Sequence, residues 1–383
     1  GPIFNIGRYR QLTLYSSLTA YIIFILYSNK HKAKKMEHLY LNTYDSFPLT
    51  ERIKEMMRSA KRYIKTGNFM FREPVMKQEI LNALNRGVVV FIISNLGEDE
   101  ERLMGYNRFS KKEYDPHLPN LNDFAEQGAH VRCMGELHAK FLVVDGEQGM
   151  VMSSNYTKDS LHGNPECGVD LDADNTICLE RIFDTLFVHA DDKIEGRDKF
   201  GYKFKKVESL VNSNIFDDVL KFDISMTLAA KQQKDVKLQD TNFCDCQITG
   251  IYDAINSTIE KAKKYVFLMA YSFRALYKLP KVRNALINAA ERGVSVNLIY
   301  NSDNHGSQAE IEKLQAVSST INALGVPKNH AKILLTDEDA FLFTANIDGE
   351  AGLLSGFELG VFLYDTLWDE AREVINKISC INQ

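Results

Sequence analysis

Apolar residues along the chain follow two spacings in turn, that of a helix face and that of a strand. From Thr50 to Lys65 they recur at helical intervals, and the run Tyr63–Phe71 is then rich in β-forming side chains. Segment 75–85 has the helical spacing again, and Arg86-Gly87 ends it before the apolar run 88–94. The pattern predicts helix, strand, helix and strand in that order.

The second half of the chain repeats this order. Helices are predicted over 255–264 and 281–292, and strands over 265–273 and 294–300. The two copies also share short sequences, which are AKRY at 60–63 and AKKY at 262–265, FR at 71–72 and 273–274, and RGV at 86–88 and 292–294. We therefore expect an α/β fold of two lobes, each with a mixed or mostly parallel sheet flanked by helices.

The length of the chain also favours two lobes. Single hydrophobic cores usually stop growing near about 250 to 300 residues, and this chain has 383. We place the first lobe at 40–190 and the second at 248–383, with a charged connector at 191–247 that contains some helix and no core of its own. Its run KFGYKFKK (199–206) is typical of a solvated connector, with contact to a polyanion as the alternative.

Residues 1–39 form a separate N-terminal segment with an apolar run and a basic tail. The run Leu12–Tyr27 is shorter than the roughly 20 residues of a spanning helix and contains serine, threonine and tyrosine, so we favour a core element over a membrane anchor. If the run does cross a membrane, the lysine-rich segment 30–35 places the two lobes in the cytoplasm. Gly1-Pro2, in place of a methionine, is typical of the remainder of a cleaved tag.

Composition excludes several classes of protein. Apolar residues make up 45% and charged residues 25%, the balance of a globular protein, and a net charge of −5 argues against coating nucleic acid by bulk electrostatics. The six cysteines are sparse and irregular, which predicts a reducing, cytoplasmic location without a disulfide framework. Cys244 and Cys246 form a lone C-x-C without further ligands at zinc spacing, so no metal site is predicted.

Each copy ends in the same set of polar residues. The first set is His138, Lys140, Asp145, Asn155 and Glu166, and the second is His330, Lys332, Asp337, Asn346 and Glu358. The interval from histidine to glutamate is 28 residues in both copies. Because residues two apart on a strand share a face, each histidine and lysine point the same way, whereas each aspartate points to the other face. One H-x-K is a weak signal, but two complete sets predict one functional site, with structural roles for the aspartates.

These residue types suit the transfer of a phosphoryl group. A histidine can attack phosphorus through a neutral ring nitrogen, while an ammonium and an amide hold the non-bridging oxygens on which charge builds. A carboxylate on the other ring nitrogen fixes the tautomer and supports the charged ring, and Glu166 and Glu358 are the candidates. Such a set needs no metal and no cofactor.

At these residues the chain resembles the phospholipase D superfamily, whose signature is H-x-K-x4-D followed by a Gly/Ser-rich turn and an asparagine. The resemblance covers both lobes and implies a pseudo-two-fold axis, one cleft shared by both motifs, and a covalent phosphohistidine intermediate. It makes His138 and His330 the catalytic pair, with His138 favoured as the nucleophile. By the same resemblance the phosphate ligands are Lys140, Lys332, Asn155, Asn346 and Ser153. Because one chain carries both motifs, the site does not require a dimer, and the oligomeric state is left open.

The sequence departs from the family signature just before each asparagine. Met152-Ser153 replaces Gly-Ser in the first copy, and Thr344-Ala345 replaces it in the second, with one residue fewer after the histidine. A phosphate-side hydroxyl is therefore expected only in the first copy.

The motif does not identify the phosphodiester. We favour a nuclease for DNA or RNA, because basic and aromatic residues expected in loops beyond the strands would hold a nucleic-acid strand. These residues are Arg72, Arg274, Tyr106, Arg108, Phe109, Lys111 and Lys112. One alternative is a phospholipase D or phosphatidyltransferase that meets a lipid membrane through an apolar surface such as Leu12–Tyr27. A second is a catalytically idle module that binds nucleic acid or protein, against which both intact H-x-K motifs argue.

Overall fold

The computed structural model of the chain describes residues 38–95, 115–135, 137–190, 192–198, 201–206, 226–231, 247–350, 352–354 and 356–380. The apolar run 12–27, the loop candidates 106–112 and the cysteines at 244 and 246 lie outside these ranges. Within the described ranges, every helix is too short or too polar to cross a bilayer.

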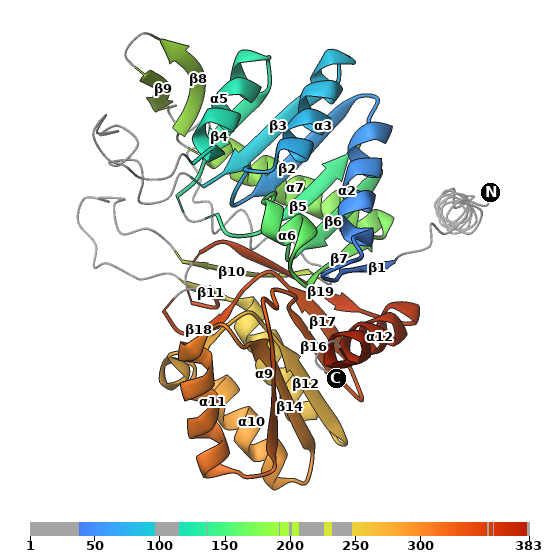
Figure 1. The fold of residues 1–383 in the computed structure, drawn as a ribbon, viewed down its shortest axis with the longest axis vertical. Coiled ribbons are helices and arrows are strands. Elements are labelled where there is room, and N and C mark those ends of the chain that lie inside the picture. The colour runs from blue at the N-terminus through green and yellow to red at the C-terminus, as the bar shows by residue number, and fades with distance from the viewer. Residues whose placement is uncertain are drawn as a thin grey trace, which may run out of the picture. The chain divides into compact units, whose positions relative to one another are not determined.

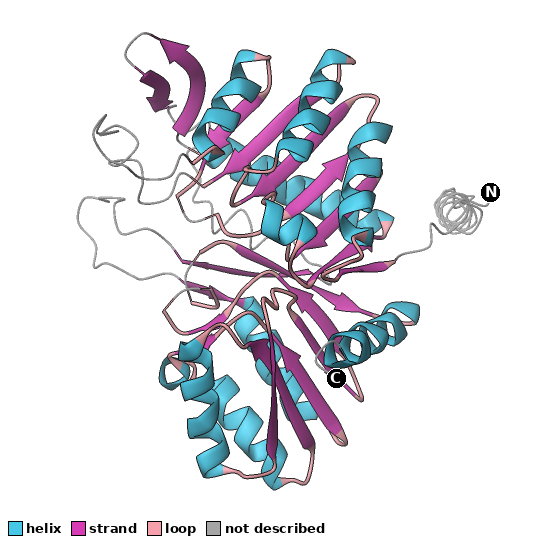
Figure 2. Ribbon diagram, in the orientation of Figure 1, coloured by secondary structure: helices cyan, strands magenta, loops and turns pink. Residues whose placement is uncertain are grey.

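The first lobe is a mixed sheet with helices on both faces (Figure 1, Figure 2). In chain order its elements are β1 (Leu39–Asn42), α2 (Pro48–Ser59), β2 (Tyr63–Asn68), α3 (Pro74–Asn85), β3 (Val89–Ser94), α5 (His117–Glu126), β4 (His130–Cys133), β5 (Phe141–Val144), β6 (Gln148–Met152), α6 (Lys158–His162), β7 (Glu166–Leu171), α7 (Ala173–His189), β8 (Asp192–Asp198) and β9 (Gly201–Lys206). The described strands lie in the order β1-β7-β6-β5-β2-β3-β4-β8-β9. Strands β2, β3 and β4 are parallel, and the other neighbours are antiparallel.

The second lobe has the same construction. Its elements are β10 (Met226–Lys231), β11 (Gln247–Thr249), α9 (Gly250–Lys261), β12 (Tyr265–Met269), β13 (Phe273–Arg274), η1 (Leu276–Lys278), α10 (Pro280–Glu291), β14 (Ser295–Asn301), α11 (His305–Val317), β15 (Ile321–Val326), β16 (Ile333–Thr336), β17 (Ala340–Phe343), β18 (Ile347–Asp348), β19 (Glu358–Leu363) and α12 (Thr366–Cys380). Its main sheet has the order β11-β10-β19-β17-β16-β12-β14-β15, and β13 pairs with β18 in a separate two-stranded sheet.

Seven strands of each main sheet match in order and direction. The run β1-β7-β6-β5-β2-β3-β4 corresponds to β10-β19-β17-β16-β12-β14-β15, and in both runs only the last three strands are parallel. The duplication predicted from short shared sequences is therefore confirmed at the level of topology.

Three buried apolar clusters hold the described fold together, one more than the length of the chain suggests. Side chains alternate across each strand, so Leu142 and Val144 of β5 face a cluster with α2, α3 and α5, whereas Phe141 and Val143 face a different one. The second lobe has its own cluster with α9, α10 and α11. The third cluster contains residues of both lobes, including α7 and α12, because the inner faces of the two sheets pack on each other.

The predicted connector contributes strands to both sheets. Strands β8 and β9 extend the first sheet beyond β4, and β10 and β11 extend the second beyond β19. The helix expected in this stretch does not occur in its described residues, which are all strands. Strands β9 and β11 form the outer edges of the two sheets, with β8 and β10 inside them, and Ile194 of β8 joins the buried cluster of the first lobe.

The helices predicted over 75–85 and 281–292 begin and end within one residue of the predicted bounds, whereas the one predicted over 255–264 begins five residues earlier, at Gly250, and ends at Lys261. The helix expected over 50–65 ends at Ser59, because the turn that follows is held by the carboxylate of Asp145. That carboxylate accepts the backbone N–H groups of Lys61 (2.9 Å), Arg62 (2.8 Å) and Tyr63 (2.8 Å). Asp337 accepts the equivalent groups of the second lobe at 3.0, 3.0 and 3.5 Å. The two aspartates lie at the far end of β5 and β16 from the histidines.

We expect Asp145→Asn to lower stability and leave turnover close to that of the wild type. Asp145 has φ 58°, which asparagine also adopts readily, so the backbone is kept while the charge-assisted bonds are lost. The free energy of unfolding in urea should fall by about 1.5–3 kcal/mol, and Asp337→Asn, at a less buried position, should cost less. Lost turnover at unchanged stability would place Asp145 in the site.

Candidate active site

The histidines of the two motifs lie just before β5 and β16, and each backbone is anchored on the other lobe. The N–H of His138 donates to the carbonyl of Phe357 (3.0 Å), and the N–H of His330 donates to the carbonyl of Pro165 (2.9 Å). Residue Leu137 also forms a parallel bridge with Phe357. The two motifs are thus held against each other by main-chain hydrogen bonds as well as by the shared apolar cluster.

The glutamates cross between the lobes. Nδ1 of His138 lies 2.5 Å from Oε1 of Glu358, and Nδ1 of His330 lies 2.9 Å from Oε1 of Glu166. Each dyad therefore combines a histidine of one motif with the glutamate of the other, a pairing that the sequence alone does not reveal. Contacts that are reciprocal in this way define a two-fold relation between the lobes. They also leave Nε2 as the ring nitrogen of each histidine that does not face a glutamate.

A hydroxyl group backs each glutamate. The Ser153 hydroxyl donates to Oε2 of Glu166, and the Thr344 hydroxyl donates to Oε2 of Glu358 at 2.6 Å. Ser153 and Thr344 are fully buried, and each also accepts the N–H of the residue after its glutamate. Two expectations are corrected here. Ser153 supports a carboxylate and is not turned toward a substrate, and the second copy does retain the equivalent hydroxyl, as Thr344.

The shorter second copy differs at the turn of a hairpin. Val144 pairs with Gln148 across the turn from β5 to β6, which leaves three residues in the loop. In the second lobe Leu335 pairs with Ala340, and the N–H of Thr336 donates to the carbonyl of Asp339, which closes a loop one residue shorter. The missing residue lies at the end of the strands remote from the histidines and does not disturb the site.

The motif lysines are buried charges. Lys140 and Lys332 have 0% of their surface exposed. The Lys332 ammonium donates to the carbonyl of His330 (2.9 Å), and the Lys140 ammonium donates to that of His138 while lying 3.3 Å from the His138 Nε2 atom. Buried charges require compensation, and the two glutamates supply it, so four buried charges sum to zero beside the two histidines.

The asparagines take matched places two residues after the backing hydroxyls. Asn155 and Asn346 are half-buried, and the Oδ1 atom of each is buried without a hydrogen-bond partner in the described part of the chain. Their contact with a phosphate stays a prediction.

The two arginines proposed as substrate ligands are paired with carboxylates. Arg72 is bound to Asp115 (2.9 Å from Nε to Oδ1), and Arg274 lies 3.9 Å from Asp348 and 4.0 Å from Glu350. The hydrogen-bonded carboxylate of Asp115 offsets much of the attraction of Arg72 for a nucleic-acid strand, whereas the longer and half-exposed contacts of Arg274 offset less. The loop residues 106–112 lie outside the described ranges.

Two aromatic residues that the motif search missed pack on the catalytic rings. The ring centroid of Phe69 lies 5.1 Å from that of His138, and the centroid of Tyr271 lies 5.1 Å from that of His330. Both residues stand two positions before the repeated Phe-Arg pair. Aligning the copies at that pair gives the signal by which they can be found.

Burial controls the protonation of the site. It lowers the pKa of His330 to about 4, outweighing the raising effect of Glu166, and it lowers the pKa of His138 against the same effect of Glu358. Burial also lowers the pKa of Lys140 to about 7. Burial raises the pKa of each glutamate, but the facing histidine and the lysines outweigh it and hold the value below the usual range. Neutral histidines next to ionised glutamates follow at neutral pH.

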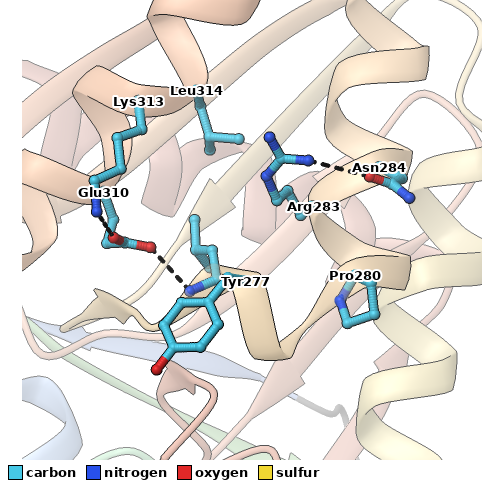
Figure 3. Close-up of a pocket in the computed structure, with 8 residues that line it drawn as sticks. Tyr277, Pro280, Arg283, Asn284, Glu310, Lys313 and Leu314 are labelled. Atoms are coloured by element: carbon cyan, nitrogen blue, oxygen red, sulfur yellow. Dashed lines mark hydrogen bonds and ion pairs between the residues drawn. The ribbon is translucent and has the colours of Figure 1, made fainter.

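A surface pocket of the second lobe is separate from this site. A cavity of about 350 Å³ lies between η1 and the helices α10 and α11, and Figure 3 shows Tyr277 at one side of it and Arg283 at the other. Glu310 accepts the N–H of Leu276 (2.9 Å) and also the ammonium of Lys313. These bonds fasten η1 to α11, and none of the motif residues lines the cavity.

Each α/β lobe contributes a histidine, a buried lysine and a glutamate that contacts the histidine of the other lobe. This duplicated arrangement defines a phosphodiesterase. A family model described as "Cardiolipin synthase, PLD-like domain" matches residues 53–186 and 255–380. The chain therefore belongs to the phospholipase D superfamily, as the two H-x-K motifs predict.

Individual relatives share the fold at low sequence identity. The chain is 25% identical over 307 residues to phospholipase D Z of Dictyostelium discoideum, covering 70% of this chain and 66% of that one. The structure of phosphatidylserine synthase from Haemophilus influenzae Rd KW20 is similar with a TM-score of 0.59 at 11% identity, over 89% of this chain and 86% of that one. Polyphosphate kinase from Porphyromonas gingivalis gives 0.52 at 14% identity, over 90% of this chain and 50% of that one. The chain thus spans slightly less than two thirds of the curated relative.

The buried glutamates should make the fold acid-sensitive. Their folded-state pKa is lowered, so their stabilising effect is full above the unfolded value of about 4.3 and is lost as the pH falls through the folded value. Comparing the wild type with Glu358→Gln, we expect the difference in melting temperature to be largest near neutral pH and to narrow below about pH 4.

The matched control is Glu338→Gln, which removes an exposed carboxylate paired with Lys263. Its difference from the wild type should be small at every pH. A difference for Glu358→Gln that does not vary with pH would show that Glu358 is not ionised in the folded protein.

Proposed function

We propose that this chain cleaves or transfers lipid phosphodiesters through a phosphohistidine intermediate. The structural observation that carries the chemistry is the pair of crossed dyads, in which each glutamate holds Nδ1 and leaves Nε2 to other partners. At His138 the Lys140 ammonium lies 3.3 Å from Nε2, where it can also meet a phosphate oxygen. The lipid substrate class is supported by the description of the matching family, which refers to cardiolipin synthase, and by the name of the curated relative, a phospholipase D.

The charges of the site suit a phosphodiester monoanion. With both histidines neutral and both lysines protonated, Lys140 and Lys332 balance Glu166 and Glu358, so the bound phosphate is the only uncompensated charge. Burial lowers the pKa of Lys140 to about 7, and the phosphate anion favours its protonated form. A negative charge next to a buried histidine favours its protonated form. Substrate binding therefore supplies the condition under which one histidine becomes the acid while the other stays a nucleophile.

The proposed reaction has two displacements. Nε2 of His138 attacks phosphorus, the bond to the leaving alcohol breaks, and protonated His330 gives its proton to the leaving oxygen. Neutral His330 then takes a proton from water or a second alcohol, whose oxygen attacks phosphorus and releases His138. The buried ammonium groups are fixed before the reaction and stabilise the charge that builds on the non-bridging oxygens.

Cleavage of nucleic acid is the competing proposal, and the described residues give it less support than the sequence suggests. Arg72 and Arg274 are the described members of the predicted strand-binding set, and both are paired with carboxylates. The family chemistry is shared by both substrate classes, so a direct comparison of substrates decides between them.

We expect release of the head alcohol from phosphatidylcholine or phosphatidylglycerol vesicles in excess EDTA, because the site supplies nucleophile, acid and charge stabilisation from side chains. Single-stranded DNA, double-stranded DNA and RNA at the same phosphate concentration should remain intact. Cleaved nucleic acid beside untouched vesicles would replace the lipid proposal with the nuclease. Activity that is lost in EDTA and restored by a divalent ion would contradict the mechanism.

Lys140→Met and Lys332→Met each remove one buried ammonium group from the site. Each should lower kcat by on the order of 100-fold, and because each also leaves a buried glutamate unbalanced, the melting temperature should fall as well. Lys263→Met, at an exposed position, should leave both values close to the wild type. Near-normal turnover in both motif variants would show that the repeats are only structural.

The two histidines should differ in a trapping experiment. In His330→Ala a p-nitrophenyl phosphodiester has a leaving group good enough to phosphorylate His138 without an acid, and the adduct then persists for lack of an activated water. After a quench in base, mass spectrometry should find the added phosphoryl group on the peptide with His138 and no adduct in His138→Ala. An adduct on His330 in His138→Ala would reverse the assignment.

A further inference from the structure

The two half-sites match in every motif residue but differ in the aromatic side chain against each histidine. Histidine, lysine, glutamate, backing hydroxyl and asparagine each have an equivalent in the other lobe. The ring on His138 is Phe69 and the ring on His330 is Tyr271, at the same centroid distance of 5.1 Å and at similar interplanar angles of 59° and 61°. One hydroxyl therefore breaks the symmetry of the site next to the reacting groups.

The Tyr271 hydroxyl is available to a ligand. The side chain is half-buried, and no residue in the described part of the chain forms a hydrogen bond with its hydroxyl. A tyrosine hydroxyl both donates and accepts hydrogen bonds. At this half-buried position it is free to bond to a polar group of a bound substrate.

The in-line geometry of phosphoryl transfer decides which part of the substrate lies next to Tyr271. The attacking and leaving atoms lie on opposite sides of phosphorus, and the histidine that protonates the leaving oxygen must be within hydrogen-bond reach of it. With His138 as the nucleophile, the leaving alcohol lies at His330. The alcohol that enters in the second displacement takes the same place, because His330 removes its proton. A ring packed on His330 therefore borders the alcohol, and a ring packed on His138 does not.

We propose that Tyr271 is a specificity-determining residue that binds the alcohol part of the phosphodiester, and the alcohol that replaces it, through a second polar group on that alcohol. The ring of Tyr271 holds His330 in place, and its hydroxyl bonds to a further hydroxyl or amine one or two carbons from the reacting oxygen. The site thus favours a polyhydroxy or amino alcohol over a simple alkanol or water. Phe69 offers no such bond on the His138 side.

The test measures the choice of acceptor on a soluble substrate, so it does not depend on lipid cleavage. The wild-type chain is incubated with bis(p-nitrophenyl) phosphate and an equimolar mixture of glycerol and 1-propanol. Release of p-nitrophenol reports the first displacement, and the ratio of glyceryl to propyl p-nitrophenyl phosphate reports the second. If vesicles remain intact while this reaction proceeds, the lipid proposal fails and the role of Tyr271 is still measured.

Three conservative variants test which side of the site determines the ratio of glyceryl to propyl product. Tyr271→Phe keeps the ring and should lower the ratio of glyceryl to propyl product by about 3- to 10-fold, the effect of one hydrogen bond. Phe69→Tyr, the pseudo-symmetric counterpart, should leave the ratio within about twofold. Tyr277→Phe, a tyrosine with 68% of its surface exposed on η1, should leave both the ratio and the rate unchanged.

Several results would overturn the proposal. They are a ratio in Tyr271→Phe within about twofold of the wild type, a change that appears in Phe69→Tyr instead, and a wild-type chain that transfers the phosphoryl group to water alone. Thermal unfolding of each variant is measured alongside, and the loss of one hydroxyl with the ring retained should leave it close to the wild type.

Discussion

Two lysine ammonium groups with no solvent contact impose the strictest condition on this fold. An isolated ammonium ion in a protein interior costs several kcal/mol, and the compensation comes from glutamates that start β7 and β19. Each glutamate crosses to the histidine of the other lobe, and a buried hydroxyl donates to its Oε2 atom, which in Glu166 also lies 3.0 Å from Nδ1 of His330. The buried charges, the hydroxyls and the contact between the lobes therefore depend on one another. Each half needs the glutamate of the other half to complete its histidine dyad.

This constraint explains why the lobes share a core. The strands that carry the motifs have one face in a cluster of their own lobe and the other face in the cluster common to both. A small displacement between the lobes would lengthen the two histidine–glutamate hydrogen bonds and expose apolar surface at the same time. The geometry around phosphorus is thus held by rigid elements and by packing, as precise placement of catalytic groups requires.

The alternation of helices and strands, the duplication and the H-x-K motifs could all be predicted from sequence, because they depend on local spacing. The crossing of Glu166 and Glu358 could not, since it depends on how two distant segments meet. Ser153 was assigned to the substrate from its place in the family signature, two residues before Asn155, which does not reveal the direction of its hydroxyl. The strands within 191–231 were not predicted, because this stretch is charged and irregular and lacks the apolar alternation from which strands are recognised.

The equal interval of 28 residues between histidine and glutamate has a less simple origin than the sequence suggests. The second lobe is one residue shorter in the hairpin loop, and its separation from backing hydroxyl to glutamate is 14 residues, compared with 13 in the first lobe. One loss and one gain cancel, and both fall in loops between strands that keep their pairing. A change of one residue at each of these two positions therefore leaves the reacting groups of both halves in equivalent places, so that length can vary between the halves where it does not alter the site.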